Sequence, residues 1–526
     1  MKLRFIRGAF ILFVLAAIVW MPPSSPAQTV PHNILFVLAD DIGTDAFSLY
    51  NTNTVGTSFA LTPNIDALAA QAVRFRNCYG YPSCTPTRSC LLTGRYGFRT
   101  GLGAAIDDPH DPYLSPRDYT LAKALTANPQ LGIQQAHIGK WHLSEAAIDP
   151  NLIGGWSHYS GYLGGERESY FNWEKTIDGV TSVTTNYCLS DSVDDAINWI
   201  GAQGTNRWFL WFAPKAAHAP LHKPPNNLHS YDSLPGDEAD IATNQPPYYR
   251  AMIEALDTEM GRLLPNINLS NTLVVFMADN GTPVDTIQPP YAFFQCKGTL
   301  FEGGVRLPMF ITGAGVVATN RWTDAVVHAV DLPVTLLEMA GVNLATTAPT
   351  NLTFDGRSFA SVLRNQPWNP TEDVILIENF GSIIEAPLRG VAVRGARYKL
   401  HHLDSGVELF YDLQSDPYEH TNLISSLTVQ QQAVYSVFTN KLAGWHNPPT
   451  PPSILQSSAT NGLVKISVPE QIGINYGLLR ATSLTATNWL LVSNYVREVH
   501  TNEAVVSVTD PTPVSPAFYR VVAQGR

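Results

Sequence analysis

The sequence predicts an α/β protein whose buried central sheet is followed by a smaller subdomain of short strands and a small all-β module. Continuous apolar runs, typical of strands buried on both faces, alternate with segments of helical periodicity. From about residue 355 the apolar runs shorten, and beyond residue 453 apolar and polar residues alternate as in antiparallel strands. The apolar runs are residues 33–39, 208–213 and 273–278, further strands are predicted at 73–79 and 133–138, and the helical segments are 62–72, 121–125, 193–200, 248–264 and 331–341.

The composition of the 526 residues limits the class of protein. Hydrophobic residues make up 45% of the chain, which is enough for a large core and excludes a disordered protein. The formal net charge of −11 argues against nucleic acid as a partner. An anionic substrate would therefore need a local cluster of basic groups, and a metal ion could supply part of that charge.

Residues 1–27 are predicted to be a secretory signal peptide. Basic residues precede an apolar stretch at 9–20 that is too short for an ordinary membrane span, and the Ser-Pro-Ala at 25–27 is suited to cleavage. The alternative is an uncleaved N-terminal anchor. We expect a secreted or periplasmic protein with no membrane span after cleavage.

The chain has five cysteines, and an odd number in a secreted protein points to one special thiol. If Cys84 is set aside as that residue, the other four could form two disulfides in any of three connectivities, or none. The sequence does not choose between these. The four residues are Cys78, Cys90, Cys188 and Cys296.

Two of the predicted strands end in pairs of oxygen donors. Asp40 and Asp41 follow the first long apolar run, and Asp279 and Asn280 follow the last. Functional groups in α/β sheets gather beyond the carboxyl ends of such strands. Four oxygen ligands of this kind suit Ca²⁺. A single Asp-Asp pair could equally be a solvated strand end, so the repetition carries the argument.

Residues 84–95, CTPTRSCLLTGR, are the segment around which we expect the site to be built. The strand at 73–79 leads to Cys84, and the apolar run after Arg88 can continue as a helix. Cys84 would then lie near a helix N-terminus, which favours negative charge, beside the permanent positive charge of Arg88. The alternatives are a buried or disulfide-bonded cysteine and a thiolate phosphatase loop. The phosphatase loop is rejected, because it requires an arginine six positions after the cysteine, where Cys90 stands.

The Cys-x-Pro-x-Arg pattern followed by Leu-Thr-Gly-Arg resembles the maturation signature of the type I sulfatases. Other segments resemble the same family: Gly-Lys-Trp-His-Leu at 139–143, His-Ala-Pro at 218–220, Asp-Asn-Gly at 279–281 and Phe-Glu-Gly-Gly-Val-Arg-Leu-Pro at 301–308. The resemblance covers roughly residues 32–446 and implies a sulfuric ester hydrolase of the arylsulfatase type. It also implies an alkaline-phosphatase-like fold, in which helices flank a large mixed sheet and a smaller C-terminal α+β subdomain has a short antiparallel sheet.

In that family a formylglycine-generating enzyme oxidises the cysteine to Cα-formylglycine, and the hydrated aldehyde is the nucleophile. The resemblance implies that Cys84 is this modified residue and that Arg88 orients its diol. It implies that His142 contacts the diol and removes its remaining proton, so that sulfate is expelled and the aldehyde is restored.

The resemblance also implies how a sulfate ester is held. Lys140 and Lys297 would bind the sulfate oxygens, and His218 would protonate the leaving oxygen. Asp279 would bind the metal and assist deprotonation of the attacking hydroxyl. The implied substrate is a sulfated glycan or an aryl sulfate. The implied ion is Ca²⁺, with Mg²⁺ as the substitute, and its ligands would be Asp40, Asp41, Cys84, Asp279 and Asn280.

Two other functions are compatible with the sequence. A phosphodiesterase or phosphonate monoester hydrolase has a related fold and nucleophile, and assays with aryl sulfates and aryl phosphate diesters would separate it from a sulfatase. A catalytically silent glycan-binding protein would keep Cys84 unmodified and would bind glycans without turnover.

Residues 150–190, inside the predicted catalytic domain, are rich in Gly, Tyr and Trp and are expected to form loops that either face a sugar ring or fill an irregular lobe.

The expected organisation of the chain has five parts. The parts are a signal peptide at 1–27, a catalytic domain at 28–354, a C-terminal subdomain at 355–446, a stiff Pro-rich linker at 447–452 and a β-sandwich-like module at 453–526.

Overall fold

The computed structural model describes residues 30–445 with short gaps, and the strands of the segment from residue 456 to residue 524. The predicted signal peptide at 1–27 and the linker at 447–452 lie outside the described residues. Within the described part of the chain, no helix combines the length and the apolar character needed to cross a bilayer. The gaps before residue 445 are 107–112, 145–147, 167–168, 351, 369–373 and 382–388.

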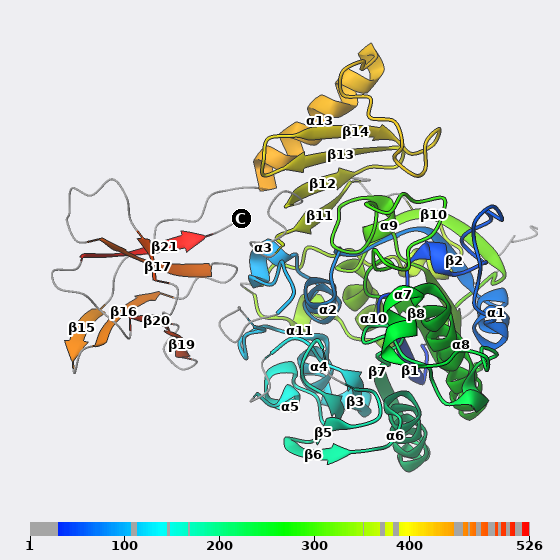
Figure 1. Ribbon diagram of the computed structural model, residues 1–526. Coiled ribbons are helices and arrows are strands. Elements are labelled where there is room, and N and C mark those ends of the chain that lie inside the picture. Colours follow the sequence, from blue (N-terminus) through cyan, green and yellow to red (C-terminus); the bar gives the residue numbers. More distant parts are fainter. Residues whose placement is uncertain are drawn as a thin grey trace, which may run out of the picture.

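A ten-stranded mixed sheet forms the centre of the protein, in the order β10-β2-β9-β8-β1-β7-β3-β4-β5-β6 (Figure 1). Strands β8, β1, β7, β3 and β4 are parallel neighbours, so their carboxyl ends lie at one edge. Strand β9 is antiparallel to both of its neighbours, and β5 and β6 form an antiparallel hairpin. The strands are β1 (Asn33–Ala39), β2 (Val73–Tyr79), β3 (Ile133–Lys140), β4 (Tyr159–Tyr162), β5 (Trp173–Ile177), β6 (Val180–Thr184), β7 (Arg207–Ala213), β8 (Thr272–Ala278), β9 (Met309–Gly313) and β10 (Arg321–His328).

Helices cover both faces of this sheet because the apolar residues of its strands alternate between two clusters. In β1 the even-numbered residues pack with α2, α4 and α10, whereas the odd-numbered apolar residues pack with α1, α6 and α8. The predicted α/β fold with a large mixed sheet flanked by helices is therefore confirmed. These helices are α1 (Pro63–Ala70), α2 (Cys84–Thr93), α4 (Leu121–Thr126), α6 (Cys188–Gln203), α8 (Gln245–Leu263) and α10 (Asp331–Ala340).

A second, antiparallel sheet of four strands follows the catalytic part, and helix α13 (Val429–Trp445) packs against it (Figure 1). Nζ of Lys399, from this sheet, lies 3.0 Å from Oε1 of Glu302 and 3.2 Å from Oε1 of Glu419. This buried cluster connects the small sheet to α9 (Glu302–Val305) of the catalytic part. The strands are β11 (Ile375–Asn379), β12 (Gly390–Arg394), β13 (Tyr398–Leu403) and β14 (Glu408–Asp412).

The C-terminal segment forms two antiparallel sheets, in the orders β15-β16-β20-β19 and β18-β17-β21. Nη1 of Arg480 in β17 lies 2.8 Å from Oδ2 of Asp510 in β20, which links the two sheets. The segment is therefore an all-β module, as predicted. Its strands are β15 (Gln456–Thr460), β16 (Leu463–Pro469), β17 (Asn475–Ala481), β18 (Leu490–Leu491), β19 (Val496–His500), β20 (Val505–Asp510) and β21 (Phe518–Gln524).

Part of the central sheet differs from the expectation of loops at 150–190. Strands β4, β5 and β6 extend the sheet there, and β6 is exposed along most of its length. An exposed edge strand needs no apolar run, and the signal here lies instead in Asp178-Gly179, a two-residue turn between runs rich in β-branched residues. Two of the cysteines also have clear roles as buried thiols: Sγ of Cys78 contacts Sδ of Met309 at 3.7 Å, and Sγ of Cys90 donates to the carbonyl of Arg95.

Candidate active site

The ends of β1 and β8 bring the predicted metal ligands together. The two strands are parallel neighbours, and Ala39 lies opposite Ala278 as the last residue of each. The next residues, Asp40 and Asp279, therefore leave the sheet side by side. The backbone N–H of Asp41 donates to Oδ1 of Asp279 at 3.2 Å, which joins the two strand ends.

Four oxygen donors gather at this edge of the sheet. Asp40, Asp41 and Asp279 offer carboxylate oxygens that lie within 4.8 Å of one another, and none of these side chains is more than 2% exposed. Oδ1 of Asn280 is also buried and accepts no hydrogen bond from any residue that the structure describes. Buried carboxylates need a compensating positive charge, and Ca²⁺ prefers oxygen ligands of these kinds. The donor set therefore fits a Ca²⁺ ion.

The charge on these carboxylates depends on two lysines. Nζ of Lys140 lies 3.0 and 2.8 Å from Oδ1 and Oδ2 of Asp40, and Nζ of Lys297 lies 2.7 and 2.8 Å from the corresponding oxygens of Asp41. Burial alone would raise the pKa of both carboxyl groups, but the ammonium groups hold it below the ordinary value. Burial and the nearby Asp40 raise the pKa of Asp279 well above its ordinary value. A divalent cation bound here would stabilise the charged form of Asp279 and lower its pKa again.

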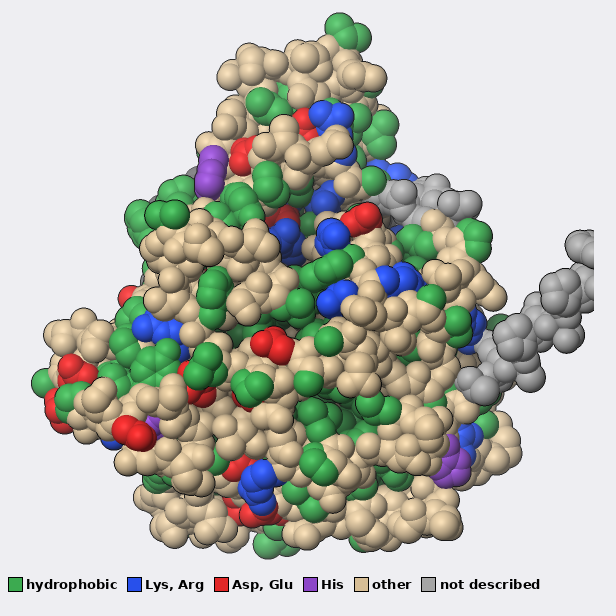
Figure 2. All heavy atoms as spheres, turned by 90° about the vertical axis from the view of Figure 1, so that its right-hand side faces the viewer, with side chains coloured by type: hydrophobic (Ala, Val, Ile, Leu, Met, Phe, Trp, Pro, Cys, Tyr) green, Lys and Arg blue, Asp and Glu red, His purple; other side chains and the backbone are tan. Residues whose placement is uncertain are grey.

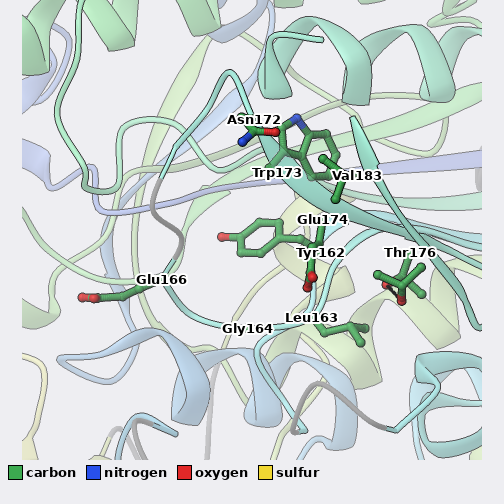
Figure 3. Close-up of a pocket in the computed structure, with 10 residues that line it drawn as sticks. Tyr162, Leu163, Gly164, Glu166, Asn172, Trp173, Glu174, Thr176 and Val183 are labelled. Atoms are coloured by element: carbon green, nitrogen blue, oxygen red, sulfur yellow. Dashed lines mark hydrogen bonds between the residues drawn. The ribbon is translucent and has the colours of Figure 1, made fainter. Parts of the chain in front are cut away.

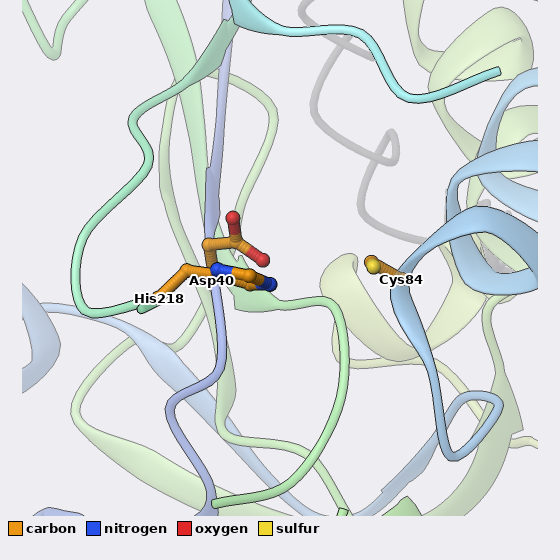
Figure 4. Close-up of side chains that lie close together, drawn as sticks. All are labelled: Asp40, Cys84 and His218. Carbon is orange, nitrogen blue, oxygen red and sulfur yellow. The ribbon is translucent and has the colours of Figure 1, made fainter. Parts of the chain in front are cut away.

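Cys84 is the first residue of α2 and faces the carboxylates. Its Sγ, a carboxylate oxygen of Asp40 and a ring nitrogen of His218 form a second group of ligand atoms within 4.8 Å (Figure 4). Sγ also lies 3.1 Å from Nδ1 of His142. The N-terminus of a ten-residue helix favours a negatively charged group at this position.

Arg88, one turn further along α2, connects the helix to the strand ends. Its Nε and Nη2 donate to Oδ2 of Asp279 at 3.0 and 2.7 Å, and its Nη1 donates to the carbonyl of Lys140 at 3.0 Å. Burial would lower the pKa of Arg88, but Asp279 raises it above the ordinary value, so the guanidinium stays charged. Arg88 therefore fixes the carboxylate of Asp279 and the backbone beside Lys140.

Two histidines border the site, and the pKa of each is lowered to about 3, chiefly by burial. Nε2 of His142 lies 3.1 Å from the carbonyl oxygen of Ile106. Nδ1 of His218 lies 2.8 Å from the carbonyl oxygen of Ala219, while its Nε2 faces Oδ2 of Asp41 at 3.8 Å. Neutral imidazoles can accept protons, and an anion placed against His218 would raise its pKa again.

The backbone is strained at two site residues. Asp41 has φ of 62° and His142 has φ of 53°, in the left-handed region that residues other than glycine rarely adopt. Such conformations cost about 1–3 kcal/mol and cluster at functional sites. The hydroxyl of Tyr249 donates to the carbonyl of Asp41 at 2.7 Å, and that of Thr85 donates to the carbonyl of His142 at 3.0 Å. These two hydrogen bonds hold the strained segments in place.

A cavity of 480 Å³ lies against β4, β5 and β6 (Figure 3). The rings of Tyr162 and Trp173 form part of its wall, and the side chain of Glu166 points away from them. The segment after β4 separates the cavity from His142, whose N–H donates to the carbonyl of Leu163 at 2.9 Å. The cavity is lined by Tyr162, Leu163, Gly164, Glu166, Asn172, Trp173, Glu174, Thr176, Thr181 and Val183.

Basic side chains are concentrated locally although the chain is acidic. On the face shown in Figure 2, Lys and Arg side chains gather around a hollow in the upper half. At the site itself Arg88, Lys140 and Lys297 are all in contact with carboxylates. An anionic ligand would therefore meet a positively charged centre once a metal ion compensates those carboxylates.

The residues that the sequence motifs indicated lie together in the structure. Tyr170 also contacts a site residue, and no motif indicated it. This residue belongs to the aromatic segment before α6, and its hydroxyl donates to the carbonyl of His218 at 2.6 Å. The only signal was the aromatic richness of residues 150–190, which does not identify a partner. The predicted site residues that meet here are Asp40, Asp41, Cys84, Arg88, Lys140, His142, His218, Asp279, Asn280 and Lys297.

Comparison with known proteins points to one family. Residues 32–342 match the family Sulfatase, and residues 291–446 match the family N-sulphoglucosamine sulphohydrolase, C-terminal. Arylsulfatase A of Bos taurus is 30% identical over 465 residues, which cover 76% of this chain and 85% of the relative. N-acetylglucosamine-6-O-sulfatase of Bacteroides thetaiotaomicron is 24% identical, with coverages of 75% and 83%.

A solved structure of Ps i-CgsB in complex with k-i-k-neocarrahexaose has a TM-score of 0.67 to this chain at 22% identity, covering 80% of this chain and 93% of that one. A protein solved with its substrate D-glucosamine-2-N,6-O-disulfate has a TM-score of 0.60 at 21% identity, with coverages of 79% and 97%. At these identities the likeness concerns the fold, and it fits the alkaline-phosphatase-like α/β architecture.

Proposed function

The chain belongs to the type I sulfatase family, whose members are sulfuric ester hydrolases, and on this basis we propose that it removes sulfate from a sulfated carbohydrate at a Ca²⁺ site with a nucleophile made from Cys84. The observation that carries the proposal is the position of Cys84. It begins a buried helix and faces three carboxylates, three basic side chains and two histidines. Sulfate ester hydrolysis requires both a nucleophile and positive charge at one place.

Two groups would complete the site. Cα-formylglycine formed from Cys84 would supply a hydrate whose hydroxyl attacks sulfur, and Ca²⁺, or Mg²⁺ in its place, would supply positive charge for the sulfate oxygens. Asp40, Asp41, Asp279 and Asn280 would hold the ion together with residue 84. The orphaned Oδ1 of Asn280 supports its place among these ligands.

The remaining side chains have distinct tasks in this proposal. Arg88 orients the diol, and Asp279 assists loss of the proton from the attacking hydroxyl. Lys140 and Lys297 bind the sulfate oxygens. Both lysines are within 3 Å of carboxylate oxygens, so they reach the place where a sulfate beside the metal would lie.

In this proposal His218 and His142 transfer the protons. His218 gives a proton to the leaving oxygen as its bond to sulfur breaks, and the negative charge of the bound anion raises the pKa of His218 and so favours its protonated form. His142 takes the remaining proton of the diol, and its contact with Sγ of Cys84 places it within reach of that residue. In a formylglycine hydrate at residue 84, loss of this proton would allow sulfate to leave and the aldehyde to form again.

A sulfated carbohydrate is the favoured substrate. Among the relatives, an N-acetylglucosamine-6-O-sulfatase is named for a sulfated sugar, and two solved neighbours are complexes with k-i-k-neocarrahexaose and with D-glucosamine-2-N,6-O-disulfate. In this chain a cavity with Tyr162 and Trp173 in its wall lies on the other side of the segment after β4 from His142, and aromatic side chains of this kind can pack against sugar rings. A signal peptide would direct the enzyme to the periplasm or the exterior, where such polysaccharides occur.

The proposal is tested with protein made together with a formylglycine-generating enzyme. Peptide mass spectrometry should show residue 84 with oxygen in place of the elements of H₂S, and a panel of sulfated glycans and aryl sulfates should identify a substrate. A higher kcat/KM for aryl phosphate diesters would favour a phosphodiesterase or phosphonate monoester hydrolase instead. Glycan binding without turnover by modified protein would favour a silent binding protein.

A further inference from the structure

The loop that carries His218 is held by a residue outside every motif. Residues 215–218 form a turn in which the N–H of His218 donates to the carbonyl of Lys215 at 2.9 Å. The hydroxyl of Tyr170 faces the carbonyls at both ends of this turn, at 2.6 Å from that of His218 and 3.1 Å from that of Lys215. Tyr170 is 1% exposed, so water cannot replace this donor.

Tyr170 itself is held by rigid neighbours. Its carbonyl accepts a hydrogen bond of 2.9 Å from the N–H of Cys188, the first residue of α6. Its ring centroid lies 4.2 Å from that of His222 and 5.4 Å from the ammonium of Lys215. The hydroxyl of Tyr170 is therefore held in a fixed position between α6 and the turn at residues 215–218.

The ring of His218 depends on the same backbone. Its Nδ1 lies 2.8 Å from the carbonyl oxygen of Ala219, so the ring is oriented by the peptide that follows it, and only Nε2 is directed toward Asp41 and the site. Figure 4 shows the ring extending from its loop toward Asp40 and Cys84. A shift of the carbonyl of His218 would displace the next residue, Ala219, whose carbonyl orients the ring, and would so redirect Nε2.

We propose that Tyr170 is a positioning residue for His218: its hydroxyl fixes the carbonyl of His218 and, through it, the direction of Nε2. The inference rests on the proposed role of His218 as the general acid. When the bond between sulfur and the leaving oxygen breaks, its electron pair stays on oxygen, and a proton on Nε2 must lie on the line to that oxygen. Tyr170 would have no part in substrate binding or in attack on sulfur.

This role makes the effect of Tyr170 depend on the leaving group. A basic leaving oxygen needs the proton, whereas a nitrophenolate leaves without it. In Tyr170→Phe, kcat should fall about 10-fold for 4-methoxyphenyl sulfate and phenyl sulfate and by less than about 2-fold for 4-nitrophenyl sulfate, with KM little changed. Tyr170→Met also lacks the donor, and it gives a second version of the comparison if the Phe variant does not fold.

Tyr187→Phe is the matched control. Tyr187 belongs to the same aromatic cluster, but its hydroxyl pairs with Nε2 of His222 at 3.0 Å instead of with the carbonyl of His218. This variant should keep the leaving-group dependence of the unmutated enzyme. Melting temperatures of the variants within a few degrees of one another would show that folded proteins are being compared.

Combination with His218→Ala gives the decisive measurement. If Tyr170 acts through His218, adding Tyr170→Phe to His218→Ala should cause no further loss of kcat. An equal loss across the aryl sulfate series, or an additive loss in the double variant, would overturn the positioning role. If modified unmutated enzyme turns over neither these aryl sulfates nor any sulfated glycan of the panel, the proposed function fails, and with it the premise of this inference.

Discussion

Arg88 donates two hydrogen bonds to a single oxygen of Asp279, Oδ2, and the other oxygen accepts the backbone N–H of Asp41. Both partners are almost completely buried. The carboxylate is therefore held at a fixed angle between helix α2 and the end of β1. This is the arrangement expected of a metal ligand whose orientation is set by neighbouring donors.

Replacement of Arg88 by lysine should disturb that orientation while keeping the positive charge. An ammonium cannot reproduce the planar pair of donors, and charged hydrogen bonds are worth about 1.5–3 kcal/mol each. We expect kcat/KM on the best substrate to fall about 100-fold. Arg262→Lys, at a half-exposed position on α8, is the control and should leave kcat/KM unchanged. Equal activities for the two variants would contradict the role of Arg88.

Cys84→Ala should abolish turnover, because no formylglycine can form, while the fold persists. Circular dichroism and thermal melting would establish the fold. Cys90→Ala is the matched control: this cysteine lies on the same helix, but its Sγ donates to the carbonyl of Arg95. That variant should lose about 1 kcal/mol of stability and retain its turnover number. Activity of the Cys84→Ala variant would refute the assignment of the nucleophile.

Asp279→Ala should remove both metal binding and activity. Titration calorimetry of the chelator-treated protein with Ca²⁺ should show a heat of binding that disappears in the variant. Asp324→Ala, at a carboxylate whose side chain is 85% exposed, should bind Ca²⁺ as the unmutated protein does. Unchanged Ca²⁺ affinity in Asp279→Ala would show that the ion lies elsewhere.

The buried cluster around Glu419 should make stability dependent on pH. Its Oε1 lies 2.7 Å from Nε2 of His401 and 3.2 Å from Nζ of Lys399. Burial alone would raise the pKa of Glu419, but Lys399 and then His401 lower it to about 2. A carboxyl group with a lowered pKa in the folded state stabilises the protein above its ordinary pKa of 4.5 and loses that contribution as the pH falls toward 2.

Glu419→Gln should therefore reduce the free energy of unfolding by about 3 kcal/mol at neutral pH, because it leaves a buried ammonium group without its full compensation. The difference between the two proteins should shrink as the pH is lowered from 4.5 toward 2. Denaturant unfolding at a series of pH values would measure it. A difference that is independent of pH would show that the carboxylate charge contributes nothing.

Much of the site could be predicted because its residues follow buried strands. The apolar runs of β1 and β8 are easily recognised, and parallel pairing then requires Asp40 and Asp279 to emerge side by side. The contact between Tyr170 and His218 could not be predicted, because it depends on how two loops pack and leaves no periodic pattern. The hairpin of β5 and β6, in contrast, could have been predicted, because Asp178-Gly179 joins two runs rich in β-branched residues.

If Cys84 is oxidised as proposed, the complete burial of α2 determines when that oxidation can take place. All ten residues of this helix are buried, and the side chain of Cys84 is only 3% exposed. An enzyme that oxidises this thiol cannot reach it once the sheet and its covering helices have closed. Chains that fold before oxidation would keep an unmodified cysteine at residue 84. The active fraction of a preparation would therefore depend on the rate of oxidation relative to the rate of folding.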